Sequence, residues 1–252
     1  MMTPALAVRR AVLLYGAVAL AAALIVLIVL ALAGVSLLWS VLAGLVIGLC
    51  GTGLLYRRQE AMVLRSVGAE PLRPGAHPRL ENVVAGLCVS NGFREPALYI
   101  IDDAAPNMLA VGRHPRHGAL VTSTGLLERL GRVELEGAVA HELTRIRNRT
   151  TLLDATVGVL IVRPLGLVPT LAGSLAQRLL DPRTNVEVDA ASVQVTRYPP
   201  GLASALRSLR SDGRAPKANP LAFRHLWVDP PADPIVAPDF SIDDRIEVLD
   251  QL

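Results

Sequence analysis

The sequence predicts an α+β protein whose amino-terminal part is a two-helix membrane hairpin. Three observations support this fold class. No charged residue lies between Arg10 and Arg57. The rest of the chain alternates helix-like and short strand-like patterns, which predicts a mostly helical domain with a small sheet. A further short apolar segment, at about 152–180, follows within that domain.

The uncharged run is roughly twice the length that one helix needs to cross a bilayer. Gly34-Val35-Ser36, near its middle, offers a turn. We therefore expect residues 1–58 to form a transmembrane hairpin. A cleaved signal peptide is the alternative, but its apolar core would be much shorter and would end in a small-residue cleavage site.

Arginine pairs flank both ends of the hairpin. Arg9-Arg10 precede the apolar run, Arg57-Arg58 follow it, and the connecting turn has no charge. Positive residues favour the cytoplasmic side of a membrane. We expect a multi-pass protein of the cell (inner or plasma) membrane, in contact with the lipid bilayer, whose domain of residues 59–252 faces the cytoplasm.

The composition argues against a nucleic-acid partner. The net charge is +3 and the pI is about 9.2, but residues 1–58 contain four arginines and no acidic residue. The basic excess therefore lies beside apolar segments. Aromatic residues, which would stack on bases, make up only 4% of the chain. The two cysteines, Cys50 and Cys88, form no disulfide framework and fit a reducing compartment.

The third apolar stretch, Leu152 to Leu180, is not a clean membrane span. An arginine near its centre is costly in lipid, and two prolines break or kink a helix. We expect a short kinked hairpin that lies at the membrane interface or packs on the first two helices; a buried pair of soluble helices is the alternative. The interrupting residues are Asp154, Arg163, Pro164 and Pro169.

The first part of the domain combines one helix with three strands. Residues 77–92 carry apolar side chains at helical spacing and end in Asn-Gly, which predicts a helix and its stop. Segments 97–102, 108–111 and 119–122 read as strands.

The chemically informative segment is a predicted helix from Arg132 to Arg147. His141, Glu142 and Arg145 crowd one of its faces within a single turn. A zinc hydrolase has H-E-x-x-H here: two imidazoles at i and i+4 bind the metal, and the glutamate activates the metal-bound water. Arginine has no lone pair to donate, so the i+4 residue of this HELTR sequence is no zinc ligand. On its own, a His-Glu pair is more often part of an ordinary surface helix.

Several segments, in order, give the chain a wider resemblance. It resembles the HtpX-type membrane zinc endopeptidases, relatives of the CAAX prenyl proteases, over nearly all of its length. The matching segments are PNMLAVG at Pro106–Gly112, TSTGLLERL at Thr122–Leu130, ELEGAVAHE at Glu134–Glu142, NVEVDAAS from Asn185, HLWVDPP from His225 and DRI at Asp244–Ile246.

The resemblance implies a zincin-like (gluzincin) domain with vestigial site residues. His141 stands at the first zinc ligand and Glu142 at the catalytic glutamate. Arg145 replaces the second ligand. If Asp189 is the supporting aspartate of the family, Asn185 replaces the third-ligand glutamate. Two of three protein ligands are then missing, and an amide is a poor zinc ligand.

Two further departures bear on this site. Glu187 would supply a ligand only in a shifted register, because it lies about 200° around a helix from Asn185. The late H-P-P of the family is Asp239-Phe240-Ser241.

We expect Arg145 to replace the charge of the missing metal. A buried carboxylate without a partner is costly. As an internal cation, Arg145 would pair with Glu142, and with Asp189 if that residue is near. Asn185 would then form a hydrogen bond rather than bind a metal.

The resemblance also implies a peptide-binding edge strand beside the zinc helix. Its residues would be Asn107, Met108, Leu109 and Ala110, which would bind an extended chain by β-augmentation. For Asn107 alone, a plain turn after Pro106 is the alternative.

These features predict a pseudo-peptidase without a cofactor. It would serve as a binding, scaffold or regulatory subunit of a membrane protein complex, with another membrane protein or a peptide segment as its partner. One alternative is an active zinc-dependent membrane endopeptidase in protein quality control. Another is a complex subunit whose groove is filled by its own chain, for example by Leu221–Pro234.

Overall fold

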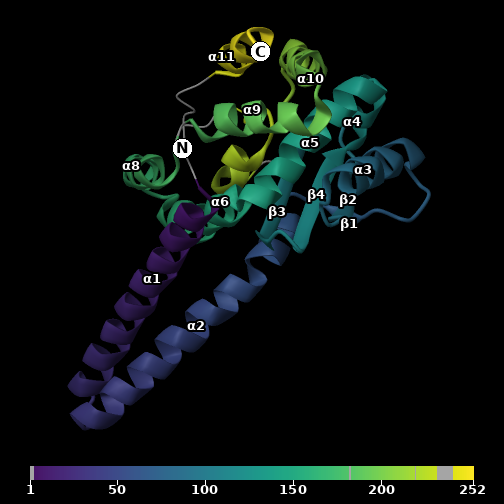
Figure 1. Cartoon of the computed structure of the whole chain (residues 1–252). Coiled ribbons are helices and arrows are strands. Elements are labelled where there is room, and N and C mark those ends of the chain that lie inside the picture. Colours follow the sequence, from purple (N-terminus) through teal and green to yellow (C-terminus); the bar gives the residue numbers. More distant parts are fainter. Residues whose placement is uncertain (1–2, 182, 219, 232–240) are drawn as a thin grey trace.

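Two long antiparallel helices form a stalk that carries the rest of the chain at one end (Figure 1). The computed structural model describes residues 3–181, 183–218, 220–231 and 241–252. The stalk consists of α1 (Pro4–Leu32) and α2 (Leu37–Ser66). The turn between them includes Gly34, whose φ of 81° favours glycine. The predicted turn and hairpin are confirmed.

Small residues bring the two stalk helices close together. A Cβ atom added to Gly44 would lie 2.6 Å from the carbonyl oxygen of Ala23, and one added to Gly48 would lie 2.5 Å from that of Ala19. Helix packing in membranes uses such small residues, because lipid provides no hydrophobic force that drives helices together.

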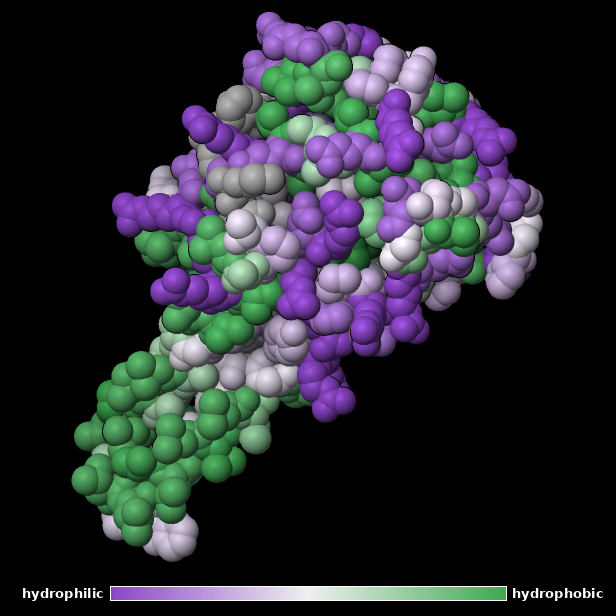
Figure 2. Space-filling view, in the orientation of Figure 1, coloured by the Kyte–Doolittle hydropathy of each residue, from purple (hydrophilic) through white to green (hydrophobic). Residues whose placement is uncertain are grey.

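The outer surface of the stalk is apolar. Figure 2 shows hydrophobic residues over almost the whole stalk, and hydrophilic residues gather on the domain. Both helices are long and apolar enough to cross a membrane, and only 11% of the most apolar window of α1 is buried. A water-exposed surface of this kind would be unfavourable, whereas lipid solvates it.

The hairpin does not end where the expected domain begins. Helix α2 runs without a break past Arg58 to Ser66. Val63, Val67 and, from α1, Ala7 are fully buried in the core of the domain. The boundary expected between residues 58 and 59 therefore falls inside a continuous helix, because the stalk helices extend into the core.

A four-stranded sheet lies at the centre of the domain. Its order is β1 (Glu70–Pro71), β2 (Ala97–Ile101), β4 (His117–Ser123) and β3 (Met108–His114). Strands β2 and β4 are parallel, and β3 and β4 form an antiparallel hairpin. The three predicted strands are confirmed, with β3 and β4 longer than expected.

The sheet separates two hydrophobic clusters. Leu109 and Val121 point into one cluster, with the stalk ends and the apolar segment after α5. Met108 and Leu120, their neighbours along the strands, point into the other, which includes α5. Alternate residues of a strand face opposite sides, so both faces of this sheet are covered.

The second cluster is formed mainly by helices. Helix α3 ends at Gly92, which has a left-handed conformation, as the Asn-Gly sequence predicted. Helix α5 packs tightly on α10, since a Cβ atom on Gly137 would lie 2.5 Å from the amide nitrogen of Leu202. These helices are α3 (Pro78–Asn91), α4 (Thr124–Arg129), α5 (Arg132–Asn148), α9 (Thr184–Thr196), α10 (Pro199–Asp212) and α11 (Ile242–Asp250).

The apolar stretch after α5 is buried in its first half and exposed in its second. It consists of α6 (Thr150–Val157), a π-helical turn η1 (Gly158–Val162), α7 (Arg163–Leu165) and α8 (Pro169–Leu179). Most of α6 and η1 lies in the core, whereas Leu167 is 97% exposed. The first half therefore matches the alternative of buried helices, and in the second half Ala172 and Ala176 of α8 are buried in the same core.

Part of the proline-rich carboxy-terminal stretch is ordered against the domain. A 3₁₀-helix, η2 (Leu221–Leu226), leads into a segment that lies beside β3. Asp239 and Phe240 lie outside the described residues, and Ser241 caps the first turn of α11.

Candidate functional site

The site is built on α5, in the interior of the domain. Glu134 stabilises the first turn of this helix by accepting a hydrogen bond of 2.8 Å from the Gly131 amide. His141 and Glu142 are completely buried, and Arg145 is 2% exposed. The helix carries these polar groups inside the core rather than on a surface, so the surface-helix alternative is wrong.

Arg145 forms the centre of a buried ionic cluster. Its Nη1 donates to Glu142 Oε1 at 3.0 Å and to the Leu226 carbonyl at 2.6 Å. Its Nη2 donates to Asp154 Oδ2 at 2.8 Å. Burial disfavours the charge, but Glu142 and Asp154 outweigh it and raise the pKa of Arg145 above its ordinary value. The expected pairing of Arg145 with Glu142 is therefore present.

A second cluster lies behind His141. His141 Nδ1 is 2.7 Å from Asp189 Oδ1. The same carboxylate accepts from Arg245 Nε at 2.7 Å and Nη2 at 3.0 Å, a bidentate pair. Burial alone would raise the pKa of Asp189, but Arg245 and His141 lower it to about 2. Asp189 thus lies beside His141, and it pairs with Arg245 rather than with Arg145.

The outer nitrogen of His141 has no hydrogen-bond partner among the described residues. His141 Nε2 is buried, while the carboxylate of Asp189 orients the ring from the Nδ1 side. Metal-binding histidines are commonly held in this way, with one nitrogen on a carboxylate and the other on the metal. The geometry of a first ligand is therefore present.

The remaining ligand positions do not match a zinc site. Asn185 lies one turn before Asp189 on α9 and is half-buried, and no side-chain hydrogen bond joins it to another described residue. The hydrogen bond expected of Asn185 is therefore absent within this part of the chain. Glu187 lies about 200° around α9 from Asp189, so it does not face His141. Across the described ranges, no three His, Cys, Asp or Glu side chains are grouped so as to hold a metal ion.

The edge strand that should receive a peptide is covered by the chain itself. Leu109 forms an antiparallel bridge with Trp227, and the Val228 amide donates to the Met108 carbonyl at 2.9 Å. Asn107 Nδ2 donates to the Asp229 carbonyl at 2.6 Å.

Met108, Leu109 and Ala110 are also completely buried, with their side chains in the two hydrophobic clusters. A peptide would reach these residues only if Trp227–Asp229 moved away. The edge is thus closed in this structure, as in the alternative in which Leu221–Pro234 fills the groove, because the segment after η2 forms backbone contacts with β3.

The chain is similar to proteins named "Protease HtpX homolog". It is 28% identical over 239 residues to the one from Thermoanaerobacter pseudethanolicus, and this match covers 79% of this chain and 80% of that protein. It is 32% identical over 225 residues to the one from Dictyoglomus turgidum, with 76% and 74% covered. The identity reaches 39% over 122 residues with the Acidiphilium cryptum protein, with 48% and 42% covered. The chain belongs to the HtpX protease family.

The comparison with family models found no match, and neither did the comparison with solved structures. HtpX membership rests on the relatives alone, over most of the length of both chains. Together with the two apolar helices, it indicates a cell membrane protein of a metallopeptidase family.

Sequence reasoning missed the roles of two residues of this site. Asp154 was noted only as an interruption of an apolar stretch, yet it is the second carboxylate on Arg145. Arg245 was noted only within the DRI match, yet it neutralises Asp189. The covering of β3 by Trp227, in contrast, falls within Leu221–Pro234, the segment named as one that could fill the groove. The signal available for Asp154 was a charge in an otherwise apolar run, since such a charge requires a partner.

Proposed function

We propose that this protein is a non-catalytic HtpX-family member, a pseudo-peptidase that acts as a binding, scaffold or regulatory subunit of a membrane protein complex. Its hairpin crosses the membrane twice, and the domain faces the cytoplasm, as the arginine pairs at both hairpin ends favour. The exposed Leu167 supports contact of the α8 region with the membrane interface.

The observation that carries this proposal is the position of Arg145. Peptide hydrolysis by a zinc enzyme needs a carboxylate that is free to take a proton from a metal-bound water. Here the Glu142 carboxylate is paired with a buried guanidinium at 3.0 Å. Because guanidinium stays protonated and cannot bind a metal, Arg145 satisfies Glu142 and repels a cation from the second ligand position.

The covered edge strand supports the same proposal. A substrate peptide would have to displace Trp227–Asp229 and the 2.6 Å hydrogen bond between Asn107 and the Asp229 carbonyl. A partner bound elsewhere, on the apolar surface of the stalk, would meet no such barrier.

An active zinc endopeptidase in protein quality control is the second candidate. One observation favours it: His141 Nε2 is buried and has no hydrogen-bond partner among the described residues, which leaves this nitrogen available to bind a metal. That reading requires two further ligands, which Arg145 and Asn185 do not provide.

The test compares zinc content and peptide cleavage in detergent-purified protein. For the wild type we expect no bound zinc and no chelator-sensitive cleavage of unfolded casein. In an Arg145→His, Asn185→Glu variant we expect zinc to bind, because the ligand set would then be complete. An Arg132→His, Asn185→Glu variant is the control, since it places the new histidine at the exposed start of α5.

One equivalent of zinc in the wild type would overturn the proposal. Zinc in neither double variant would show that the scaffold lacks a zinc geometry at α5 and α9. The subunit role has its own test: the protein extracted from its native membrane in mild detergent should carry a second polypeptide at a fixed ratio, whereas a lone chain of 26.8 kDa would contradict that role.

A further inference from the structure

We propose that the groove between the amino-terminal end of α1 and Arg149 binds an anionic phospholipid. The lipid phosphate would contact Arg149, and an acyl chain would lie along Val8 and Val12. This inference rests on the membrane placement of the stalk and is independent of the state of the zinc site.

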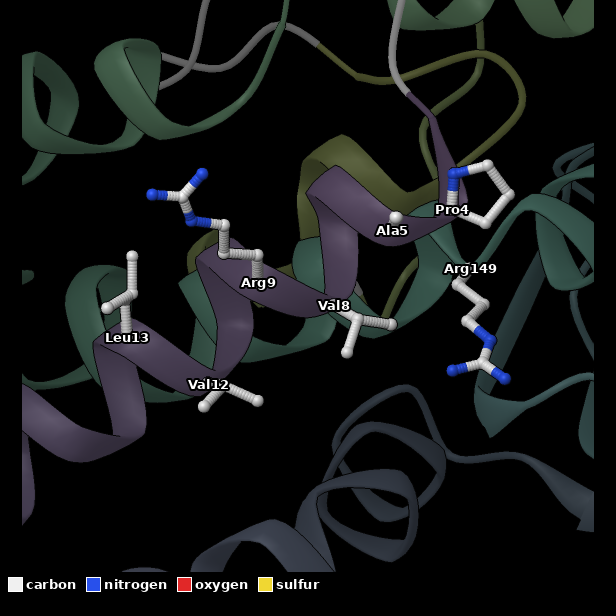
Figure 3. Close-up of a pocket in the computed structure, with 7 residues that line it drawn as sticks. All are labelled: Pro4, Ala5, Val8, Arg9, Val12, Leu13 and Arg149. Carbon is white, nitrogen blue, oxygen red and sulfur yellow. The ribbon is translucent and has the colours of Figure 1, made fainter.

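The groove has an apolar floor with a cation at one end. It has a volume of about 540 Å³, and five of its seven lining residues, all from α1, are uncharged. Figure 3 shows Val8 and Val12 on the side of α1 that faces Arg149, while Arg9 and Leu13 point to the other side. The lining residues are Pro4, Ala5, Val8, Arg9, Val12, Leu13 and Arg149.

Arg149 has a backbone conformation that glycine and asparagine adopt more readily than arginine does. It ends α5 with a φ of 59°, in the left-handed region where glycine and asparagine are preferred. Its side chain makes no ion pair or hydrogen bond with any described residue and lies half-buried in the groove. The fold itself therefore gives no reason for an arginine at this position, whereas an anionic ligand would.

The groove lies at the level where the membrane surface is expected. Arg9 and Arg10 mark the end of the uncharged run of α1, and Arg10 Nη1 donates to the Leu179 carbonyl of α8 at 2.7 Å. Arg113, near the end of β3, stacks on Tyr56 of α2, with 5.4 Å between its guanidinium carbon and the ring centroid. Helix α8 and the end of β3 thus both contact the stalk near its arginine pairs.

The charge around Arg149 is positive. Desolvation and the charges of Arg149 and Arg116 lower the pKa of His114, at the end of β3. A phosphodiester with a net negative charge complements this region. Anionic lipids are enriched in the cytoplasmic leaflet, and each arginine near the surface contributes to their attraction.

The chemistry selects a lipid rather than a free anion. Inorganic phosphate would contact Arg149 but would leave the apolar floor exposed. A zwitterionic phosphatidylcholine would cover the apolar floor, but Arg149 would repel its choline group. An anionic diacyl lipid satisfies both parts of the groove.

Native mass spectrometry of the full-length protein in detergent tests this. Dioleoyl-phosphatidylglycerol, dioleoyl-phosphatidylcholine and inorganic phosphate would be titrated separately, and phosphate would also compete with phosphatidylglycerol. For the wild type we expect phosphatidylglycerol to be retained roughly fivefold more than phosphatidylcholine, and phosphate to compete weakly. Arg149→Gly should remove that preference.

The variant is chosen so that folding is maintained. Glycine suits the left-handed backbone at this position, so the thermal stability of Arg149→Gly without added lipid should be equal to or above that of the wild type. Arg178→Gln is the matched control, because Arg178 is a basic residue of α8 outside the groove. It should keep the preference for phosphatidylglycerol.

Three results would overturn the proposal. Equal retention of the two lipids would remove the charge argument. Equal losses in Arg149→Gly and Arg178→Gln would assign the effect to the general charge of the surface. Complete displacement by inorganic phosphate would assign a simple anion site. None of these results depends on zinc, so a failure here leaves the pseudo-peptidase proposal to its own test.

Discussion

Two buried arginines, Arg245 and Arg145, lie near the His-Glu pair, and they differ in the number of carboxylates that each one neutralises. Arg245 makes a bidentate pair with one carboxylate, Asp189, which in turn orients His141. Arg145 instead bridges two carboxylates, Glu142 and Asp154. In the first arrangement, a carboxylate orients His141 in the way that carboxylates orient metal-binding histidines. The second places a fixed cation where a metal and its second ligand would be.

This difference shows which part of the site departs from the arrangement of a zinc site. Behind His141, the supporting carboxylate and its arginine are complete. On the side of Glu142, the guanidinium of Arg145 lies between two carboxylates, and the apolar stretch supplies one of them, Asp154. Both fully buried carboxylates of the site, Glu142 and Asp189, thus have an arginine as their cation.

The largest expected effect comes from removing Arg145. Arg145→Met would leave Glu142 and Asp154 buried without their cation, which we expect to lower the free energy of unfolding by about 3–5 kcal/mol. Chemical denaturation in detergent would measure it. Arg132→Met is the matched control on the same helix, because its salt bridge to Glu136 is exposed and should change stability by less than about 0.5 kcal/mol.

A rescue variant sharpens this prediction. Adding Glu142→Gln and Asp154→Asn to Arg145→Met removes the stranded charges, so most of the lost stability should return. If Arg145→Met were as stable as the wild type, the cluster would not be the replacement for a metal that we infer.

Asp189→Asn should have the next largest effect. It leaves one buried cation, Arg245, without its partner, and we expect a loss of about 3 kcal/mol. In the Arg145→His, Asn185→Glu background it should also weaken zinc binding by roughly 10–100-fold, because the imidazole loses its orienting carboxylate. Unchanged zinc affinity in that background would contradict the supporting role of Asp189.

The pH dependence of stability separates the two clusters further. The pKa of Asp189 is lowered from 3.8 to about 2, so its contribution is present above pH 4 and is lost as the pH falls toward 2. The linked free energy is about 2 kcal/mol. Stability measured between pH 5 and pH 2 should fall by this amount more in the wild type than in Asp189→Asn. Parallel curves would show that Asp189 is not ionised in a buried pair.

The sequence predicted the elements of the fold better than their contacts. The hairpin, the helix with His141 and the strands followed from local periodicity and from Gly34 and Gly92. The extension of α2 into the core was missed, because the apolar pattern of a span does not show where lipid ends and protein begins.

The site shows the same limit. Glu142 and Arg145 are three residues apart on one helix, so helical geometry alone predicted their pairing. Asp189 and Arg245 are 56 residues apart in the sequence. Trp227 and Leu109 are even farther apart in the sequence. Such pairings depend on the tertiary fold, and only the family resemblance pointed to Asp189.

The smallest expected effect comes from Asp154→Asn. This variant measures how much of the stabilisation by Arg145 comes from Asp154 and how much from Glu142. Asp154→Asn keeps an oxygen that accepts from Arg145 Nη2 but removes one charge, and Glu142 still balances the arginine. We therefore expect a loss of about 1 kcal/mol, measured by the same denaturation. A double-mutant cycle with Arg145→Met would isolate the pairwise term. A coupling well above that for Glu142 and Arg145 would mean that Arg145 is held mainly by Asp154 of the apolar stretch rather than by Glu142.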